Sequence, residues 1–276
     1  MKNKFSPQNI RPQARPFLKW AGGKTQLIDE LVKRFPEIIK EKQTIDTYIE
    51  PFIGGGALFF YLKGKYTIKK SYLFDINQDL VTVYKTVKKN PKELIKQLKG
   101  IESRYLKRSK EEREDYFYKI RKQYNRQKQR INYANFNDNW IKRTVYLIFL
   151  NKTCFNGLFR LNNKGEFNVP HGRYANPAIA DEKNILETSR ALKNTEIYCG
   201  DFTKSKKYIQ NGTLIYCDPP YRPLNTTSSF TGFTKEGFSD EDVKMIMEKT
   251  GKTEKEVSRV LKEKGDIAET IVALSE

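Results

Sequence analysis

The sequence predicts an α/β fold built around a parallel sheet. Strand-like and helix-like segments alternate along the chain. A glycine-rich turn, Glu50 to Gly56, joins one strand to the helix that follows it. Strand–helix–strand units of this kind place successive strands side by side and parallel. The predicted segments are helix 25–35, strand 46–49, helix 57–63, strand 72–74, helix 77–89 and, after a long basic interruption at 104–143, strands 196–199 and 214–217.

Composition narrows the class of protein. The 276 residues carry a formal net charge of +19, which predicts a polyanionic partner. Nucleic acid is the first candidate, and an acidic membrane surface is the second. A lysine-rich surface of a thermostable protein would give the same excess of positive charge. No apolar run could cross a membrane, and the N-terminus lacks the apolar segment of a signal peptide. We therefore expect a cytoplasmic protein with no membrane partner. Three cysteines and one histidine, His171, predict no metal site and no Ser-His catalytic pair.

The composition changes near residue 239. Every Phe, Tyr and Trp precedes Ser239, and the segment 240–276 holds more acidic than basic residues, unlike the rest of the chain. Three short helices are predicted in this tail, the second opened by a capping box of Thr253 and Glu256. The predicted organisation is a cofactor-binding part at 1–100, a target-recognition insertion at 101–190, a return to the catalytic sheet at 191–239 and a three-helix tail at 240–276.

The turn from Glu50 to Gly56 is a candidate cofactor site. Glycines between a strand and a helix let the backbone approach a ligand closely. Asp75 ends the next predicted strand, where a carboxylate can accept hydrogen bonds from ribose hydroxyls. The pattern matches neither a P-loop nor the dinucleotide fingerprint. A tight packing turn without a ligand is the alternative.

The segment Asp218-Pro219-Pro220-Tyr221 is a more specific signal. It follows the apolar strand 214–217, and its two prolines force the chain to leave the sheet at the carboxyl end, where α/β proteins bind ligands. An ordinary strand-ending turn is the alternative. The carboxylate of Asp218 and the carbonyl of Pro219 could accept the two hydrogens of an exocyclic adenine amine, so that its lone pair faces a methyl donor. Tyr221 offers a ring on which a base removed from the duplex could stack.

Four ordered blocks resemble the Dam-type family of adenine-N6 DNA methyltransferases, which includes restriction-modification methylases of GATC sites. The blocks are Phe17-Leu18-Lys19-Trp20-Ala21-Gly22-Gly23-Lys24, the turn Glu50 to Gly56, the DNA-contacting hairpin at 156–162 with 167–170 and 172–174, and Asp218 to Tyr221. The resemblance covers about residues 15–239. It implies a Rossmann-like, S-adenosylmethionine-dependent methyltransferase sheet with an inserted helical and hairpin DNA-recognition domain, and a small three-helix bundle follows at the C-terminus.

The resemblance also implies roles for individual positions. The implied catalytic residues are Asp218, Pro219, Pro220 and Tyr221. S-adenosylmethionine would meet Trp20, Lys24, Phe52, Gly54, Asp75, Asp201, Phe202 and Asp218. DNA would meet Lys19, Leu158, Arg160, Asn162, Arg173 and Tyr174, with His171 a loop residue among them. The implied reaction is methylation of N6 of a flipped adenine in duplex DNA, with GATC as the target and a cognate restriction endonuclease as a candidate partner.

Two segments allow other interpretations. The run from Arg104 to Arg130 is basic with interleaved aromatics, and it could follow phosphates or be a solvated helical face.

The tail is similar to the ubiquitin-associated-type domain of archaeal nascent-polypeptide-associated complex alpha proteins, which implies a polypeptide partner. The family normally continues past Phe238 with further strands, and without them the strand before Asp218 would be a sheet edge. The alternatives are therefore an inactive DNA-binding remnant and a protein-binding module working through the tail.

Overall fold

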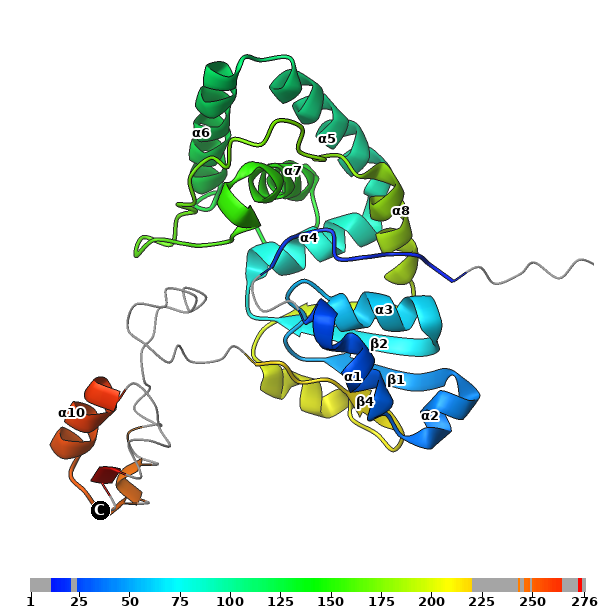
Figure 1. Ribbon diagram of the computed structural model, residues 1–276, viewed down its shortest axis with the longest axis vertical. Coiled ribbons are helices and arrows are strands. Elements are labelled where there is room, and N and C mark those ends of the chain that lie inside the picture. Colours follow the sequence, from blue (N-terminus) through cyan, green and yellow to red (C-terminus); the bar gives the residue numbers. More distant parts are fainter. Residues whose placement is uncertain are drawn as a thin grey trace, which may run out of the picture. The chain divides into compact units, whose positions relative to one another are not determined.

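The computed structural model describes residues 11–20, 24–219, 243, 246–248, 250–264 and 273–274. Two compact units are formed: residues 1–159 with 167–218, and residues 160–166 with 219–276. The first unit contains the sheet and most helices (Figure 1). Among the described residues, no helix is both long and apolar enough to span a membrane.

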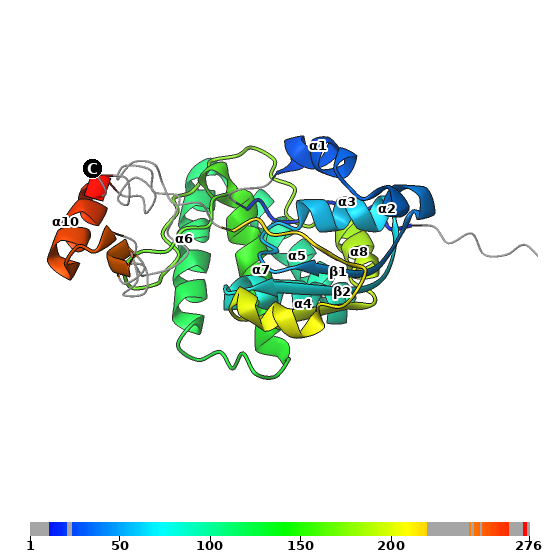
Figure 2. The same ribbon diagram turned by 90° about the horizontal axis from the view of Figure 1, so that it is seen from below.

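A four-stranded parallel sheet organises the first unit, as the sequence predicts. Its order is β3-β2-β1-β4, and the strands are β1 (Thr44–Glu50), β2 (Thr67–Asp75), β3 (Thr195–Cys199) and β4 (Thr213–Ile215). Helices α3 (Ala57–Lys65) and α4 (Gln78–Lys89) pack against β2. The 3₁₀ helix η3 (Phe202–Tyr208) lies along the side of the sheet opposite α3 (Figure 2). Two aromatic side chains of β2, Tyr72 and Phe74, contact Tyr208 of η3.

The predicted helix at 77–89 forms as α4. Asn77 caps it, because its Oδ1 accepts the backbone N–H groups of Asp79 and Leu80, both at 3.0 Å. Its predicted apolar face is buried. The predicted helix at 25–35 is shorter: it opens as a 3₁₀ turn, η1 (Thr25–Leu27), continues as α1 (Ile28–Lys33), and leaves Leu27 48% exposed. Helix α2 (Glu37–Lys42) follows.

The basic interruption of the strand–helix alternation is a group of helices. They are α5 (Pro91–Leu106), α6 (Lys110–Gln127) and α7 (Asp138–Thr153), followed by the 3₁₀ turn η2 (Phe155–Gly157) and, after the hairpin segment, α8 (Glu182–Ala191). Ser109 and Glu112 form a capping box at the start of α6. Helix α7 contacts α4, α5 and α6 and lies among them (Figure 1). The helical group is therefore packed directly on a helix of the sheet layer.

Strand β4 is more exposed than its apolar residues alone suggest. It pairs only with β1 among the described residues, so it is the edge of the described sheet. Ile215 is 37% exposed, and Cys217 is exposed as well. An apolar strand at 214–217 would be buried if strands paired on both sides of it, but the described residues show the alternative, a sheet edge. No described strand pairs with the outer side of β4, and its side chains are correspondingly less covered.

The described tail residues form a small apolar cluster within the second unit. Helix α10 (Glu254–Lys264) begins at the predicted capping box, where Glu256 Oε2 accepts the backbone N–H of Thr253 at 2.9 Å. Val257 and Leu261 pack with Ile246, and Val243, Met247 and Leu274 are partly buried against them. Most of the predicted first and third tail helices lies outside the described residues.

Candidate active site and DNA interface

The glycine turn between β1 and α3 is held by the carboxylate of Asp75. Oδ2 of Asp75 accepts the backbone N–H of Gly54 at 3.1 Å, and Oδ1 accepts that of Asn77 at 2.9 Å. Burial raises the pKa of Asp75, and the backbone donors, Asn77 first, act against this rise. Gly54 has φ +47°, in the left-handed region that favours glycine. The two parts of the predicted cofactor site are thus in direct contact.

Trp20 packs over this turn from the N-terminal block. A Cβ on Gly54 would lie 3.1 Å from Cδ1 of Trp20, and one on Gly55 would lie 3.4 Å from its Cβ. The indole also stacks on Phe159, with ring centroids 4.9 Å apart and planes 23° from parallel. Trp20 therefore joins the glycine turn to the start of the hairpin segment.

An ion pair joins the N-terminal block to the segment after β4. Nζ of Lys24 lies 3.0 Å and 3.1 Å from the two carboxylate oxygens of Asp218, and the side chains are 26% and 17% exposed. The N–H of Tyr216 donates to the carbonyl of Ile49 at 2.9 Å, which keeps this segment beside β1 beyond the last residue of β4. Pro219 follows Asp218 in the second unit, and Pro220 and Tyr221 lie outside the described residues.

Carboxylates end neighbouring strands at the same edge of the sheet. Glu50 ends β1, Asp75 ends β2, and Asp218 follows β4. Glu50 is 3% exposed, and burial raises its pKa to about 8; the hydrogen bond from the Tyr48 hydroxyl, at 2.7 Å, opposes this rise, while Asp218 and Asp75 add to it. Sequence reasoning gave Glu50 no role, although a carboxyl group at the end of an apolar strand was a usable signal.

The remaining predicted cofactor residues supply apolar surface and a cap. The rings of Phe52 and Phe202 have centroids 5.6 Å apart, and Phe202 is 47% exposed. Asp201 caps η3, because its Oδ1 accepts the N–H of Thr203 at 2.8 Å. Ile76, which the sequence analysis did not single out, is 56% exposed directly after Asp75. Exposed apolar groups therefore follow both β2 and β3, beside the carboxylates.

Some predicted DNA-contacting residues gather around η2. The Lys19 ammonium lies 5.7 Å from the ring centroid of Tyr174, and the Tyr174 hydroxyl accepts the N–H of Asn156 at 2.9 Å. Leu158 directly follows η2 and is partly buried. Phe155 of η2 is 52% exposed, and sequence reasoning missed it because an isolated aromatic carries no exposure signal.

Other predicted DNA contacts have partners of their own. Arg173 pairs with Glu114, with Nη2 3.3 Å from Oε2. Arg160 and Asn162 belong to the second unit. There Oδ1 of Asn162 accepts the backbone N–H groups of Lys164 and Glu166, so this side chain also organises its own turn.

Part of the basic run on α6 holds the hairpin segment. Arg113 donates to the carbonyls of Leu106 and Ala175, and Arg121 donates to that of Val169. Asn125 exchanges hydrogen bonds with both backbone groups of Phe167. These side chains of the run bind backbone groups and so have a structural role. Neither interpretation made from the sequence, contact with phosphates or a solvated helical face, included this role.

His171 lies in the hairpin loop, as expected, but its side chain is buried there. It is 8% exposed, pairs as an isolated bridge with Cys154, and its Nε2 lies 2.7 Å from the Tyr105 hydroxyl. Burial lowers the pKa of His171. The loop packs inward because Tyr105 and Phe117 surround the imidazole.

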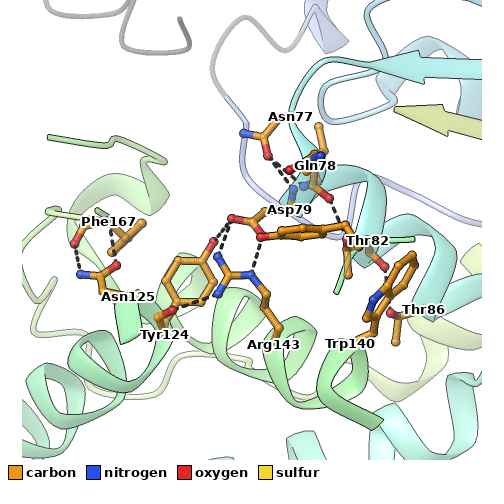
Figure 3. A network of polar contacts seen from close by, with 12 residues as sticks. Asn77, Gln78, Asp79, Thr82, Thr86, Tyr124, Asn125, Trp140, Arg143 and Phe167 are labelled. Carbon is orange, nitrogen blue, oxygen red and sulfur yellow. Dashed lines mark hydrogen bonds and ion pairs between the residues drawn. The ribbon is translucent and has the colours of Figure 1, made fainter. Parts of the chain in front are cut away.

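A buried ion pair connects α4, which follows the Asp75 carboxylate, to the helical group. Nη2 of Arg143 on α7 lies 2.7 Å from Oδ2 of Asp79 in the first turn of α4, two residues after Asn77 (Figure 3). The hydroxyls of Tyr124 and Tyr133 donate to the same carboxylate, each at 2.7 Å. Burial raises the pKa of Asp79, but the bonds from Arg143 and both tyrosines outweigh it and leave the pKa below its ordinary value.

Comparison with known proteins decides the family. A model described as "D12 class N6 adenine-specific DNA methyltransferase" matches residues 20–269. The chain belongs to this family. It is 48% identical over 231 residues to a Type II methyltransferase, M.MjaIII, of Methanocaldococcus jannaschii, with 83% of this chain and 77% of the relative covered. It is 39% identical to the Type II methyltransferase M1.LlaDCHI of Lactococcus lactis subsp. cremoris, with 85% and 75% covered. It is 33% identical to a DNA adenine methylase of Vibrio cholerae, with 88% and 78% covered.

The predicted adenine-N6 DNA methyltransferase family is thereby confirmed, and one boundary is corrected. The D12 match continues to residue 269, whereas the sequence analysis had ended the family at about residue 239. These comparisons do not support the separate resemblance of 240–276 to a ubiquitin-associated-type domain. The inactive remnant and the tail-based binding module are accordingly not favoured.

Proposed function

We propose that this member of the D12 family transfers a methyl group from S-adenosylmethionine to N6 of an adenine that has left the stack of duplex DNA, within GATC. The observation that carries the proposal is the Lys24–Asp218 ion pair, at the same sheet edge as the Asp75 carboxylate. Residues 101–190 would serve as the DNA-recognition region.

The residues at this edge suit S-adenosylmethionine. Gly54 and Gly55 leave room that a Cβ would fill against Trp20. The Asp75 carboxylate can accept hydrogen bonds from ribose hydroxyls, and Phe52, Phe202 and the exposed Ile76 offer apolar surface for a flat heteroaromatic ring. When bound, the cofactor supplies an electrophilic methyl group on a positively charged sulfur.

The protein's own part in the reaction is to position the amine. An exocyclic adenine amine is a weak nucleophile because its lone pair is delocalised into the ring. Asp218 and the carbonyl of Pro219 would accept its two N–H hydrogen bonds, which favours a pyramidal nitrogen. Lys24 holds the Asp218 carboxylate in one orientation through both oxygens. Fixed orientation of reacting groups is a large source of rate enhancement.

The target base would be reached from the side of η2. Lys19 and Tyr174 form one cluster there with Asn156, and Phe155 and Leu158 provide apolar groups that could enter a gap in the base stack. Removal of the base from the duplex costs a few kcal/mol, which such contacts would offset.

Transfer of labelled methyl groups to short duplexes tests the proposal. A duplex containing GATC should be labelled at adenine N6, and a duplex of the same composition with GTAC should not. Asp218→Ala should reduce transfer by at least about 100-fold, with S-adenosylmethionine binding retained in part. Asp46→Asn is the control, because this exposed carboxylate near the start of β1 pairs with the exposed Lys69, whereas the predicted site residues follow the carboxyl end of the strand. Absence of saturable cofactor binding would overturn the proposal.

The proposal includes a cognate restriction endonuclease that acts on the same site. Two relatives bear the name Type II methyltransferase. Plasmid DNA treated with this protein and cofactor should resist an endonuclease that cleaves only unmethylated GATC. Complete cleavage after saturating methylation would exclude GATC as the shared site.

A further inference from the structure

Asn151 on α7 pairs with both backbone groups of Lys19. Its Oδ1 accepts the N–H of Lys19 at 2.9 Å, and its Nδ2 donates to the carbonyl of Lys19 at 2.9 Å. The second Nδ2 hydrogen serves the carbonyl of Gly157, also at 2.9 Å. Asn151 is 1% exposed. Both amide N–H donors of Asn151 are therefore used. One binds the backbone of Lys19, which is remote from α7 in the sequence, and the other binds Gly157 in the turn after α7.

These bonds determine where the Lys19 side chain lies. Gly157 has φ +64°, and a Cβ there would lie 2.3 Å from Cδ of Lys19, so the lysine stem crosses the turn at a point where only glycine fits. The ammonium continues to the ring of Tyr174, 5.7 Å from its centroid. A shift of the Lys19 backbone would therefore move its charge relative to Tyr174.

The same bonds reach two further site residues through their chain neighbours. Trp20, which packs over Gly54, directly follows Lys19, and Leu158 directly follows Gly157. Asn151 is thus the point at which the N-terminal block and the hairpin turn are held together.

We propose that Asn151 is a positioning residue for DNA recognition. It fixes the position of the Lys19 backbone relative to the Gly157–Leu158 turn, and it affects DNA binding through Lys19. The inference rests on the proposed function, in which Lys19 contacts DNA. Asn151 itself has no exposed polar atom to offer a ligand, since its amide is buried and bonded to backbone.

Asn151→Asp is the most informative substitution. Aspartate is nearly isosteric and keeps the acceptor for the Lys19 N–H, but it removes both donors. An ionised carboxylate would then face the carbonyl oxygens of Lys19 and Gly157. Asn184→Asp is the matched control, because buried Asn184 also exchanges two hydrogen bonds with both backbone groups of one residue, Arg15, which has no assigned contact with DNA.

A double-mutant cycle with Lys19→Ala separates positioning from general damage. With unmethylated plasmid DNA as substrate, N151D should raise the KM for DNA by about 10- to 100-fold, and N184D should change it by less than about twofold. In the Lys19→Ala background, N151D should add less than about twofold, because the group it positions has been removed. Multiplicative effects of N151D and Lys19→Ala would overturn the inference and leave the proposed function standing. An unchanged KM in Lys19→Ala alone would instead overturn the DNA contact on which the inference rests.

The pH dependence of N151D supplies a second readout. A buried carboxyl group facing carbonyl oxygens has a raised pKa, and its neutral form can donate one of the two lost bonds. The ratio of N151D to wild-type kcat/KM for plasmid DNA should therefore rise as the pH falls from 8 to 6. A flat ratio would contradict the proposed geometry. Should N151D not fold, Asn151→Ser enters the same cycle with the same expected non-additivity.

Discussion

Asp79 and Arg143 form a buried ion pair across the junction of α4 and α7. Their side chains are 13% and 2% exposed, and Tyr124 and Tyr133 donate to the same carboxylate. Asn77, two residues before Asp79, caps α4 and also bonds to Asp75 through its N–H. The pair thus anchors the helix that follows Asp75, a residue of the proposed cofactor site, to the helix that leads into the hairpin.

Removal of one partner of this pair should be strongly destabilising. Arg143→Met leaves the Asp79 carboxylate buried with only tyrosine donors, and we expect the free energy of unfolding to fall by about 3–5 kcal/mol. Urea denaturation of purified protein measures the change. Lys69→Met, which breaks the exposed pair with Asp46 (side chains 66% and 61% exposed), should cost less than about 1 kcal/mol. Equal losses in the two variants would contradict the buried role.

Glu50 should make the protein less stable as the pH rises. Its pKa in the fold is about 8, above the ordinary value of 4.5, so the folded state binds more protons than the unfolded state between these pH values. The contribution of Glu50 to the free energy of unfolding is therefore most favourable below about pH 4.5. It decreases as the pH rises and levels off above about pH 8. Glu50→Gln should raise Tm at pH 8.5 by roughly 3–10 °C and change it little at pH 5. A Tm increase of the same size at both pH values would show that Glu50 is ionised in the fold.

Lys24 should affect the rate of methylation because it fixes the orientation of the Asp218 carboxylate. Lys24→Met keeps the length of the side chain but removes both bonds to the carboxylate. We expect kcat for DNA methylation to fall by about 10- to 100-fold, with little change in thermal stability because the pair is partly exposed. Lys33→Met, at an exposed pair within α1, is the control. A wild-type rate in Lys24→Met would remove the ion pair from the proposed site.

The room beside Gly56 should be limited by the Tyr84 hydroxyl first and by the Phe60 ring next. Gly56 has φ +70°, and a Cβ there would lie 2.7 Å from the Tyr84 hydroxyl, which donates to the carbonyl of Gly54. Gly56→Ala should cost about 2–4 kcal/mol from backbone strain and this clash. Tyr84→Phe should cost about 1 kcal/mol. The double variant should lose less than the sum, and a fully additive result in urea denaturation would refute the clash.

Much of the framework was accessible from the sequence because it depends on local pattern. Alternating periodicity predicted the parallel sheet and α4, and the glycines and prolines marked the turns at which backbone conformation is restricted. The capping box at Thr253 was predicted for the same reason. The exposure of Ile215 and Cys217 did not follow from this local pattern, because it depends on which strands pair with β4.

The sequence by itself determined the family and the order of the motifs. Only the tertiary structure decided which residues meet: Lys24 with Asp218, Asp79 with Arg143, and Asn151 with Lys19. It also assigned Arg113 and Arg121 to backbone carbonyls, where composition had suggested phosphates or solvent. The physical reason is that periodicity and turn chemistry act over a few residues, whereas hydrogen bonds between partners up to 194 residues apart arise only when packed elements bring buried polar groups together.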